Sequence, residues 1–276
     1  MNRATHAAGR TMIHVVLIVV AFVSIAPVAV IVSIALKTNT ELATNPLGLP
    51  QRWLFSNFAE AWVEAGIGRY ILNSIIVVLP TLVIVVVVAS LAGYAFALLR
   101  FPGRDILFAV FLIGLTLPAV SIVIALSFIQ QSMGLFNTLP GLILAEAALC
   151  IPLAVFLMRA AFRDLPGELR EAVLVDGGTE VTSLVRVMFP LARPAVSAVT
   201  VLTFLTVWND YLLPLVLINT ESLRTIPLGL AFLKTAFTAD VVLIAASTTL
   251  AAIPSIVIYA LLQRQFISGI TQGSIK

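Results

Sequence analysis

The chain has 276 residues, of which 61% are hydrophobic and only 11% are charged. About a quarter of the residues of a soluble domain are charged, so this composition excludes a soluble globular protein, and its hydrophobicity excludes a disordered chain. The single cysteine, Cys150, has no partner in the chain, which excludes a disulfide scaffold. Most of this protein is therefore expected to lie in lipid.

Long apolar stretches predict an all-α membrane protein with six transmembrane helices. A helix needs about 20 apolar residues to cross a bilayer, and these stretches lack the strict alternation of barrel strands. The first stretch is too long for the apolar part of a secretory signal, so we expect a retained anchor. The expected spans are residues 11–36, 74–99, 106–129, 139–158, 195–218 and 241–262.

The positive charges predict how the spans are oriented. Arginine and lysine concentrate in cytoplasmic loops, and a cytoplasmic N-terminus places eleven of the 16 inside the cell and five outside. The inner residues are Arg3, Arg10, Arg100, Arg104, Arg159, Arg163, Arg170, Arg186, Arg193, Arg264 and Lys276, and the outer ones are Lys37, Arg52, Arg69, Arg224 and Lys234. Both termini are thus expected in the cytoplasm. The net charge of +3 reflects this topology and is no argument for nucleic-acid binding.

Each expected span contains one proline. Prolines at this frequency are typical of membrane helices in general, and also of helices that kink around a transport path. These prolines are Pro27, Pro80, Pro118, Pro152, Pro214 and Pro254. Their presence alone does not separate the two interpretations.

The most charged part of the chain, residues 159–194, lies between the fourth and fifth spans and is therefore expected in the cytoplasm. Asp176-Gly177-Gly178 predicts a tight turn, because glycine adopts a positive φ at little cost. A helical stripe follows, closed by Pro190, and consists of Val181, Leu184, Val185 and Met188. The pattern predicts a helix–turn–helix that either covers the inner ends of the bundle or docks a cytoplasmic partner through exposed acidic residues.

Two acidic residues, Glu146 and Asp210, interrupt the apolar stretches in the outer half of the bundle. Acidic residues are costly in the membrane and are candidates for function. Glu146 either faces a subunit interface or contacts a translocation pathway. Asp210 follows Trp208-Asn209, a group that suits the apolar face and hydroxyls of a sugar, although polar residues also tie helices together.

Short motifs cover the chain from about residue 53 to its C-terminus. Residues 171–178 read Glu-Ala-Val-Leu-Val-Asp-Gly-Gly, and they are followed by Pro190-Leu191 and Pro194. Further motifs are Asn73-Ser74, Tyr94-Ala95-Phe96 with Phe101-Pro102-Gly103, Trp208-Asn209 and Gly273-Ser274-Ile275-Lys276. Together they resemble the EAA loop and flanking motifs of carbohydrate ABC importer permeases, in particular the maltose-type second permease subunit. Val173, Gly178 and Leu184 depart from that pattern, because the family usually has alanine at the first two positions and commonly phenylalanine at the third.

The resemblance implies a permease subunit of an ATP-driven importer, which takes up a sugar or oligosaccharide delivered by an extracytoplasmic solute-binding protein. Its partners would be a second, homologous permease subunit and two cytoplasmic ATPase subunits, in the inner or plasma membrane of a prokaryote. The chain would form one transmembrane domain, residues 1–276, with a core at 70–265 and the EAA loop at 163–194. The residues coupled to the ATPases would be Glu168, Glu171, Ala172, Asp176, Gly177, Gly178 and Pro190.

The energy source is expected on another chain. No Gly-x-x-x-x-Gly-Lys-Ser/Thr segment occurs in the sequence, so it offers no P-loop for ATP. We therefore expect no enzyme activity, cofactor or metal on this chain, and ATP and Mg on the partner ATPases. The alternative is an autonomous proton-coupled transporter that uses Glu146 and Asp210. An intramembrane enzyme with these acids as a catalytic pair has no nucleophile motif or metal cluster to support it.

Overall fold

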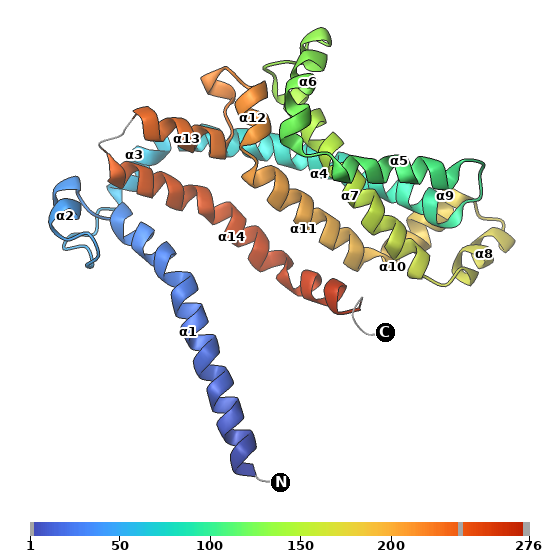
Figure 1. Cartoon of the computed structure of the whole chain (residues 1–276), viewed down its shortest axis with the longest axis horizontal. Coiled ribbons are helices and arrows are strands. Elements are labelled where there is room, and N and C mark those ends of the chain that lie inside the picture. Colours follow the sequence, from blue (N-terminus) through green and yellow to red (C-terminus); the bar gives the residue numbers. More distant parts are fainter. Residues whose placement is uncertain (1–2, 237–239, 273–276) are drawn as a thin grey trace. The chain divides into compact units, whose positions relative to one another are not determined.

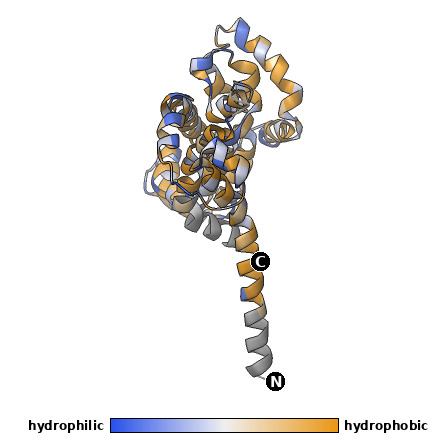
Figure 2. Cartoon of the chain, turned by 90° about the vertical axis from the view of Figure 1, so that its left-hand side faces the viewer, coloured by the Kyte–Doolittle hydropathy of each residue, from blue (hydrophilic) through white to orange (hydrophobic). Residues whose placement is uncertain are grey.

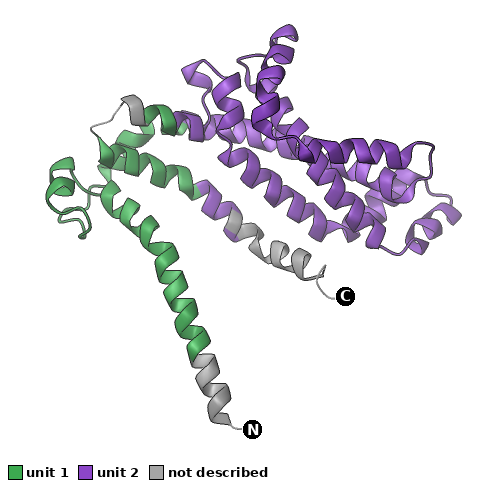
Figure 3. Ribbon diagram, in the orientation of Figure 1, with its two compact units in different colours: residues 1–68, 230–253 green, residues 69–229, 254–276 purple. Residues whose placement is uncertain are grey.

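The computed structural model describes residues 3–236 and 240–272, and the regular elements in these ranges are all helices (Figure 1). The chain divides into two compact units, residues 1–68 with 230–253, and residues 69–229 with 254–276 (Figure 3). Apolar residues dominate the long helices (Figure 2). Helices suit lipid because they satisfy their backbone hydrogen bonds internally. The predicted all-helical class is confirmed for the described residues.

The first unit is built around the N-terminal helix and the loop that follows it. It contains α1 (Arg3–Ala35), α2 (Asn39–Thr44), α3 (Ser56–Val63), the end of α13 (Ile226–Ala236) and the start of α14 (Val241–Gln272). From Met12 onward, most side chains of α1 are exposed, as expected for a helix surrounded by lipid. The loop after α1 is fastened by buried Lys37, whose Nζ donates to the carbonyl oxygens of Asn45 (2.7 Å) and Pro46 (3.3 Å).

The second unit holds the remaining elements. In chain order these are α4 (Ile67–Leu98), α5 (Arg104–Thr116), α6 (Ala119–Ser132), α7 (Leu139–Asp164), α8 (Glu168–Val175), α9 (Glu180–Ser183), the π-helix η1 (Leu184–Met188), α10 (Phe189–Leu191), α11 (Arg193–Asn209), α12 (Leu212–Leu217) and the 3₁₀ turn η2 (Glu221–Leu223). Four helical segments of the described chain are long and apolar enough to cross a membrane: Met12–Ala35, Ile67–Leu98, Leu139–Asp164 and Val241–Ile258. The number rises to six if each of two bent helix pairs counts as one span. These pairs are Arg104–Thr116 with Ala119–Ser132, bent by 106°, and Glu180–Leu191 with Arg193–Asn209, bent by 78°.

The expected third and fifth spans are not single straight helices. Residues 106–129 form α5 and α6, which meet at an angle of 106°. Pro118 is the cause, because the residue before a proline is pushed out of the helical conformation, and Leu117 is extended at φ −83° and ψ 116°. The expected fifth span, 195–218, is interrupted at Asp210, which is extended at φ −68° and ψ 130°. Pro214 lies in α12, after this break, and the other four span prolines lie inside α1, α4, α7 and α14.

Two helices of the second unit, α4 and α7, approach each other closely at Gly93. A Cβ atom on Gly93 would lie 2.7 Å from Cβ of Met158 and 2.9 Å from the backbone nitrogen of Arg159. Both distances are shorter than van der Waals contact. Only glycine allows the two backbones this near to one another, as in other close contacts between membrane helices. The contact sets the spacing of α4 and α7 at the end that carries the charged segment.

Aromatic side chains fill the core beside this contact. Phe162 of α7 is fully buried, and its ring meets the ring of Tyr94 edge to face at 5.8 Å between centroids. The guanidinium of Arg159 lies 3.9 Å from the centroid of the Phe108 ring, and its Nε donates to the carbonyl oxygen of Phe96 at 3.2 Å. The cation thus gains a π-face and an acceptor at the end of the apolar core. These contacts anchor the end of α7 from which the charged segment departs.

Candidate functional site

The charged segment forms a helical hairpin, residues 163–194, which we call the hairpin. Its first helix, α8, ends in a turn that satisfies the last carbonyl groups of the helix. The N–H of Gly178 donates to the carbonyl oxygen of Val173 at 2.8 Å, and the N–H of Gly177 donates to that of Leu174 at 3.1 Å. Gly177 has φ +81°, the left-handed conformation that favours glycine. This is a Schellman motif, and it confirms the turn predicted at Asp176-Gly177-Gly178.

Two of the three departures from the family pattern, Val173 and Gly178, touch each other in this turn. A Cβ atom on Gly178 would lie 2.6 Å from Cγ1 of Val173 and 2.8 Å from its carbonyl oxygen. The side chain and the backbone carbonyl of Val173 therefore both leave no room for a side chain at 178.

The second half of the hairpin presents an apolar face to solvent. Leu184 and Met188 are buried in the core, as the predicted stripe requires. Val181 and Val185, the other two members of the predicted stripe, are 68% and 59% exposed. The members of each pair are four residues apart, which lines them up along a helix, and it is burial that separates the two pairs. Val181 and Val185 therefore form an exposed apolar patch that no other described residue of this chain covers.

The residues expected to couple to ATPase subunits gather on the hairpin. Glu168, Glu171, Ala172, Asp176 and Gly177 are exposed, and Gly178 and Pro190 are half-buried. Both glutamates lie in the first turn of α8, where negative charge is favourable for the helix. The hairpin therefore carries an acidic helix end and an exposed apolar pair on one short segment.

A three-residue network that the sequence did not indicate ties the hairpin together. The Glu180 carboxylate accepts hydrogen bonds from Nε of Arg170 at 2.9 Å and from the hydroxyl of Tyr94 at 2.6 Å. A second guanidinium nitrogen of Arg170 also donates to this carboxylate, which makes the ion pair bidentate. This hydrogen bonding raises the pKa of Arg170 and lowers the pKa of Glu180, so both groups stay charged at physiological pH. Ten residues separate Arg170 from Glu180 and 86 separate Tyr94 from Glu180, so no local pattern marks them.

The two acidic residues of the apolar stretches lie in the same unit and interact with each other. Glu146 of α7 is 2% exposed, and its Oε1 has no hydrogen-bond partner among the described residues. Its carboxyl group is close enough to that of Asp210 for the two to interact electrostatically. Asp210 also caps α12, since its carboxylate accepts from the N–H groups of Leu212 (3.2 Å) and Leu213 (3.0 Å). Asp210, which lies at the break after α11, therefore stabilises the first turn of α12.

Trp208 and Asn209, the neighbours of Asp210, point into different surroundings. Trp208 is buried, and its ring stacks on Phe204 with 5.4 Å between centroids. Asn209 is exposed, and its amide donates to the carbonyl oxygen of Leu205 at 2.7 Å. Of the four residues considered for a pathway, Asn209 is the exposed one, while Glu146 and Trp208 are enclosed by the chain.

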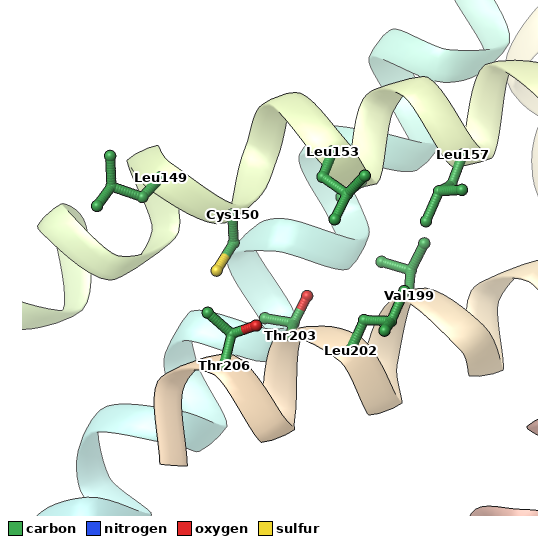
Figure 4. A pocket seen from close by; sticks show the side chains of 9 residues that line it. Leu149, Cys150, Leu153, Leu157, Val199, Leu202, Thr203 and Thr206 are labelled. Atoms are coloured by element: carbon green, nitrogen blue, oxygen red, sulfur yellow. The ribbon is translucent and has the colours of Figure 1, made fainter. Parts of the chain in front are cut away.

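A small cavity lies between α7 and α11, with side chains of the two helices facing each other across it (Figure 4). Its volume is about 100 Å³, and its polar side chains are Cys150, Thr203 and Thr206. Pockets for small molecules measure about 300–1,000 Å³, so this one is too small for an oligosaccharide. Among the described residues, no cluster of His, Cys, Asp or Glu is arranged to hold a metal ion.

Comparison with known proteins connects these features to one family. The family model described as the binding-protein-dependent transport system inner membrane component matches residues 86–272. The diacetylchitobiose uptake system permease protein NgcG of Streptomyces coelicolor is 34% identical over 265 residues, which cover 95% of this chain and 88% of that protein. The trehalose transport system permease protein SugB of Mycobacterium tuberculosis is 34% identical over 252 residues, covering 91% and 92%. Such permeases are transport components rather than catalysts.

A solved structure has the same fold. It is the crystal structure of a bacterial ABC transporter involved in the import of the acidic polysaccharide alginate, and one of its chains superposes with a TM-score of 0.82. The superposition covers 96% of this chain and 99% of the other, at 22% sequence identity. The broken helices α5–α6 and α11–α12 therefore belong to a fold that is already known from an experimental structure.

Proposed function

This chain belongs to the family of binding-protein-dependent transport system inner membrane components, and from that membership we propose that it is the permease subunit of an ABC importer for a carbohydrate. The observation that carries the proposal is the similarity to NgcG and SugB, which extends over 95% and 91% of the chain. Both relatives are permeases named for the uptake of a sugar. The substrate class proposed here is an oligosaccharide or a smaller sugar.

The proposed complex supplies what this chain lacks. A second, homologous permease completes the pathway, a solute-binding protein delivers the sugar from outside, and two ATPase subunits bind ATP and Mg on the cytoplasmic side. Both termini and the hairpin then lie in the cytoplasm, in agreement with the excess of arginine and lysine there. In this arrangement the chain acts as a single permease domain, with its core at 70–265 and the EAA loop at 163–194.

The hairpin is the proposed docking element for an ATPase subunit. Glu168 and Glu171 are exposed at one end of α8 and suit pairing with arginine. Val181 and Val185 add an apolar patch that a groove on the partner would cover. Ala172, Asp176 and Gly177 complete the exposed surface, and half-buried Gly178 and Pro190 hold its shape.

The break between α11 and α12 is the proposed contribution of this chain to the pathway. Asn209 is exposed there and offers an amide to a sugar hydroxyl. Asp210 caps the start of α12. Glu146 and Trp208 are buried and would stabilise the break without contacting the sugar. The cavity between α7 and α11 is too small to enclose a sugar, so the binding space would form together with the second permease. The comparisons lend no support to an autonomous proton-coupled transporter based on Glu146 and Asp210.

Uptake by whole cells tests the substrate class. The test uses cells that contain every other subunit of the transport system but lack this chain. They are expected to lose uptake of at least one member of a panel of labelled mono- and oligosaccharides. The wild-type chain restores that uptake, whereas a Glu171→Ala, Gly177→Asp double variant, produced at the same level in the membrane, does not. Unchanged uptake of every carbohydrate in the panel without the chain would contradict the proposal.

A further inference from the structure

The hydrogen-bonded network of Tyr94, Glu180 and Arg170 joins three separate elements. Tyr94 belongs to α4, a candidate membrane span, whereas Arg170 lies in α8 and Glu180 begins α9. The Glu180 carboxylate is the centre, because its Oε2 accepts from both Tyr94 and Arg170 while its Oε1 accepts from Arg170 alone. The two arms of the hairpin and a membrane helix therefore share one carboxylate.

The surroundings hold this network in one geometry. Tyr94 is only 3% exposed, and its ring is wedged against fully buried Phe162 of α7, so its hydroxyl has little freedom to move. The Arg170 side chain is 23% exposed and that of Glu180 is 37% exposed, so the pair lies at the edge of the core. A bidentate pair between arginine and carboxylate fixes orientation as well as distance. Apolar contacts, such as those of Leu184 and Met188, slide more easily because they have no preferred direction.

We propose that the Glu180 carboxylate, held by Arg170 and Tyr94, is the positioning link through which the hairpin and helix α4 move as one body. The inference rests on the proposed function, because it assigns to the network the passage of motion between the ATPase subunits and the membrane helices. Arg170 and Glu180 keep α8 and α9 at a constant angle, and Tyr94 carries any tilt of this pair into α4. The role assigned to the three residues needs no contact with the sugar or with ATP, so they are positioning residues.

The test uses the complete importer in proteoliposomes, and compares ATP hydrolysis with and without sugar-loaded binding protein. Glu180→Gln and Tyr94→Phe are expected to reduce the stimulation of ATP hydrolysis by the loaded binding protein, and uptake with it, by at least about fivefold. ATP hydrolysis without binding protein and co-purification of the ATPase subunits should stay at the wild-type level, because the docking surface is untouched. Tyr70→Phe is the matched control, since Tyr70 is also buried and also lies in α4. It is expected to behave as wild type.

Exchanging the charges of Arg170 and Glu180 distinguishes a role in transmitting motion from a role in stability alone. Arg170→Glu and Glu180→Arg should each abolish stimulation, and the double exchange should recover at least about half of it, because the bidentate pair re-forms and the Tyr94 hydroxyl can accept from arginine. Full stimulation in Glu180→Gln and Tyr94→Phe would overturn the inference. Loss of the ATPase subunits in both variants, without recovery in the double exchange, would overturn it as well. If the wild-type complex shows no stimulation by a loaded binding protein, the proposed function itself fails.

Discussion

Valine in place of Gly177 is expected to lower sugar uptake at least about tenfold. Gly177 has φ +81° and is exposed, so no neighbour blocks a side chain and the backbone conformation alone decides the effect. A β-branched residue in the left-handed region is strained by about 1–3 kcal/mol. The turn would relax to a negative φ, and the bonds from Gly177 and Gly178 to the end of α8 would break. Initial uptake rates in cells with equal amounts of the protein in their membranes measure the loss.

The matched control for this prediction is Gly177→Asn. Asparagine adds a side chain of comparable size, but it adopts the left-handed conformation at C-termini of helices. This variant is expected to keep most of the uptake. Equal uptake by the valine and glycine proteins would show that the shape of the turn does not matter for coupling.

Leucine in place of Gly93 is expected to destabilise the whole bundle. Even a Cβ atom at this position would lie 2.7 Å from Cβ of Met158 and 2.9 Å from a backbone nitrogen of α7, and backbone atoms cannot turn aside. Overpacking of a well-filled contact costs about 1–3 kcal/mol, and separating two backbones costs more. The midpoint of thermal unfolding of the purified complex in detergent should fall for Gly93→Ala, and further for Gly93→Leu.

Gly167→Leu is the control for the effect of leucine itself. Gly167 has φ −62° and ψ −29°, a conformation open to all residues, and a Cβ atom there would meet nothing within 4 Å. Its midpoint should stay close to that of the wild type. If Gly93→Leu and Gly167→Leu unfold at the same temperature, α4 and α7 do not depend on the contact at Gly93.

Local features of the sequence predicted much of the fold. Apolar length predicted the helices, because lipid leaves helices as the main way to satisfy backbone hydrogen bonds. Two adjacent glycines after Asp176 predicted the turn of the hairpin, and Gly177 has the positive φ expected there. The break at Pro118 was not predicted, because six spans contain a proline and only the structure distinguishes the one that separates two helices from those inside continuous helices.

The parts of the candidate site that escaped prediction depend on contacts between distant residues. Tyr94 is separated from Glu180 by 86 positions, and no periodicity links the two. The exposure of Val181 and Val185 depends on which side of the segment meets the core, and the spacing of apolar residues alone does not decide this. The sequence around Asp210 is compatible with a pathway or with a tie between helices, and its capping of α12 follows only from the position of the break.

Reconstitution of the complete importer gives the most direct test of the central claim, that this chain carries a sugar through the membrane with energy from ATPases docked on its hairpin. Uptake into proteoliposomes is measured with ATP on the side of the ATPases, with ATP absent, and with a proton gradient in place of ATP. We expect uptake only with ATP and loaded binding protein, and loss of uptake when the hairpin carries Gly177→Val. Uptake by this chain alone, driven by the proton gradient without ATP, would contradict it.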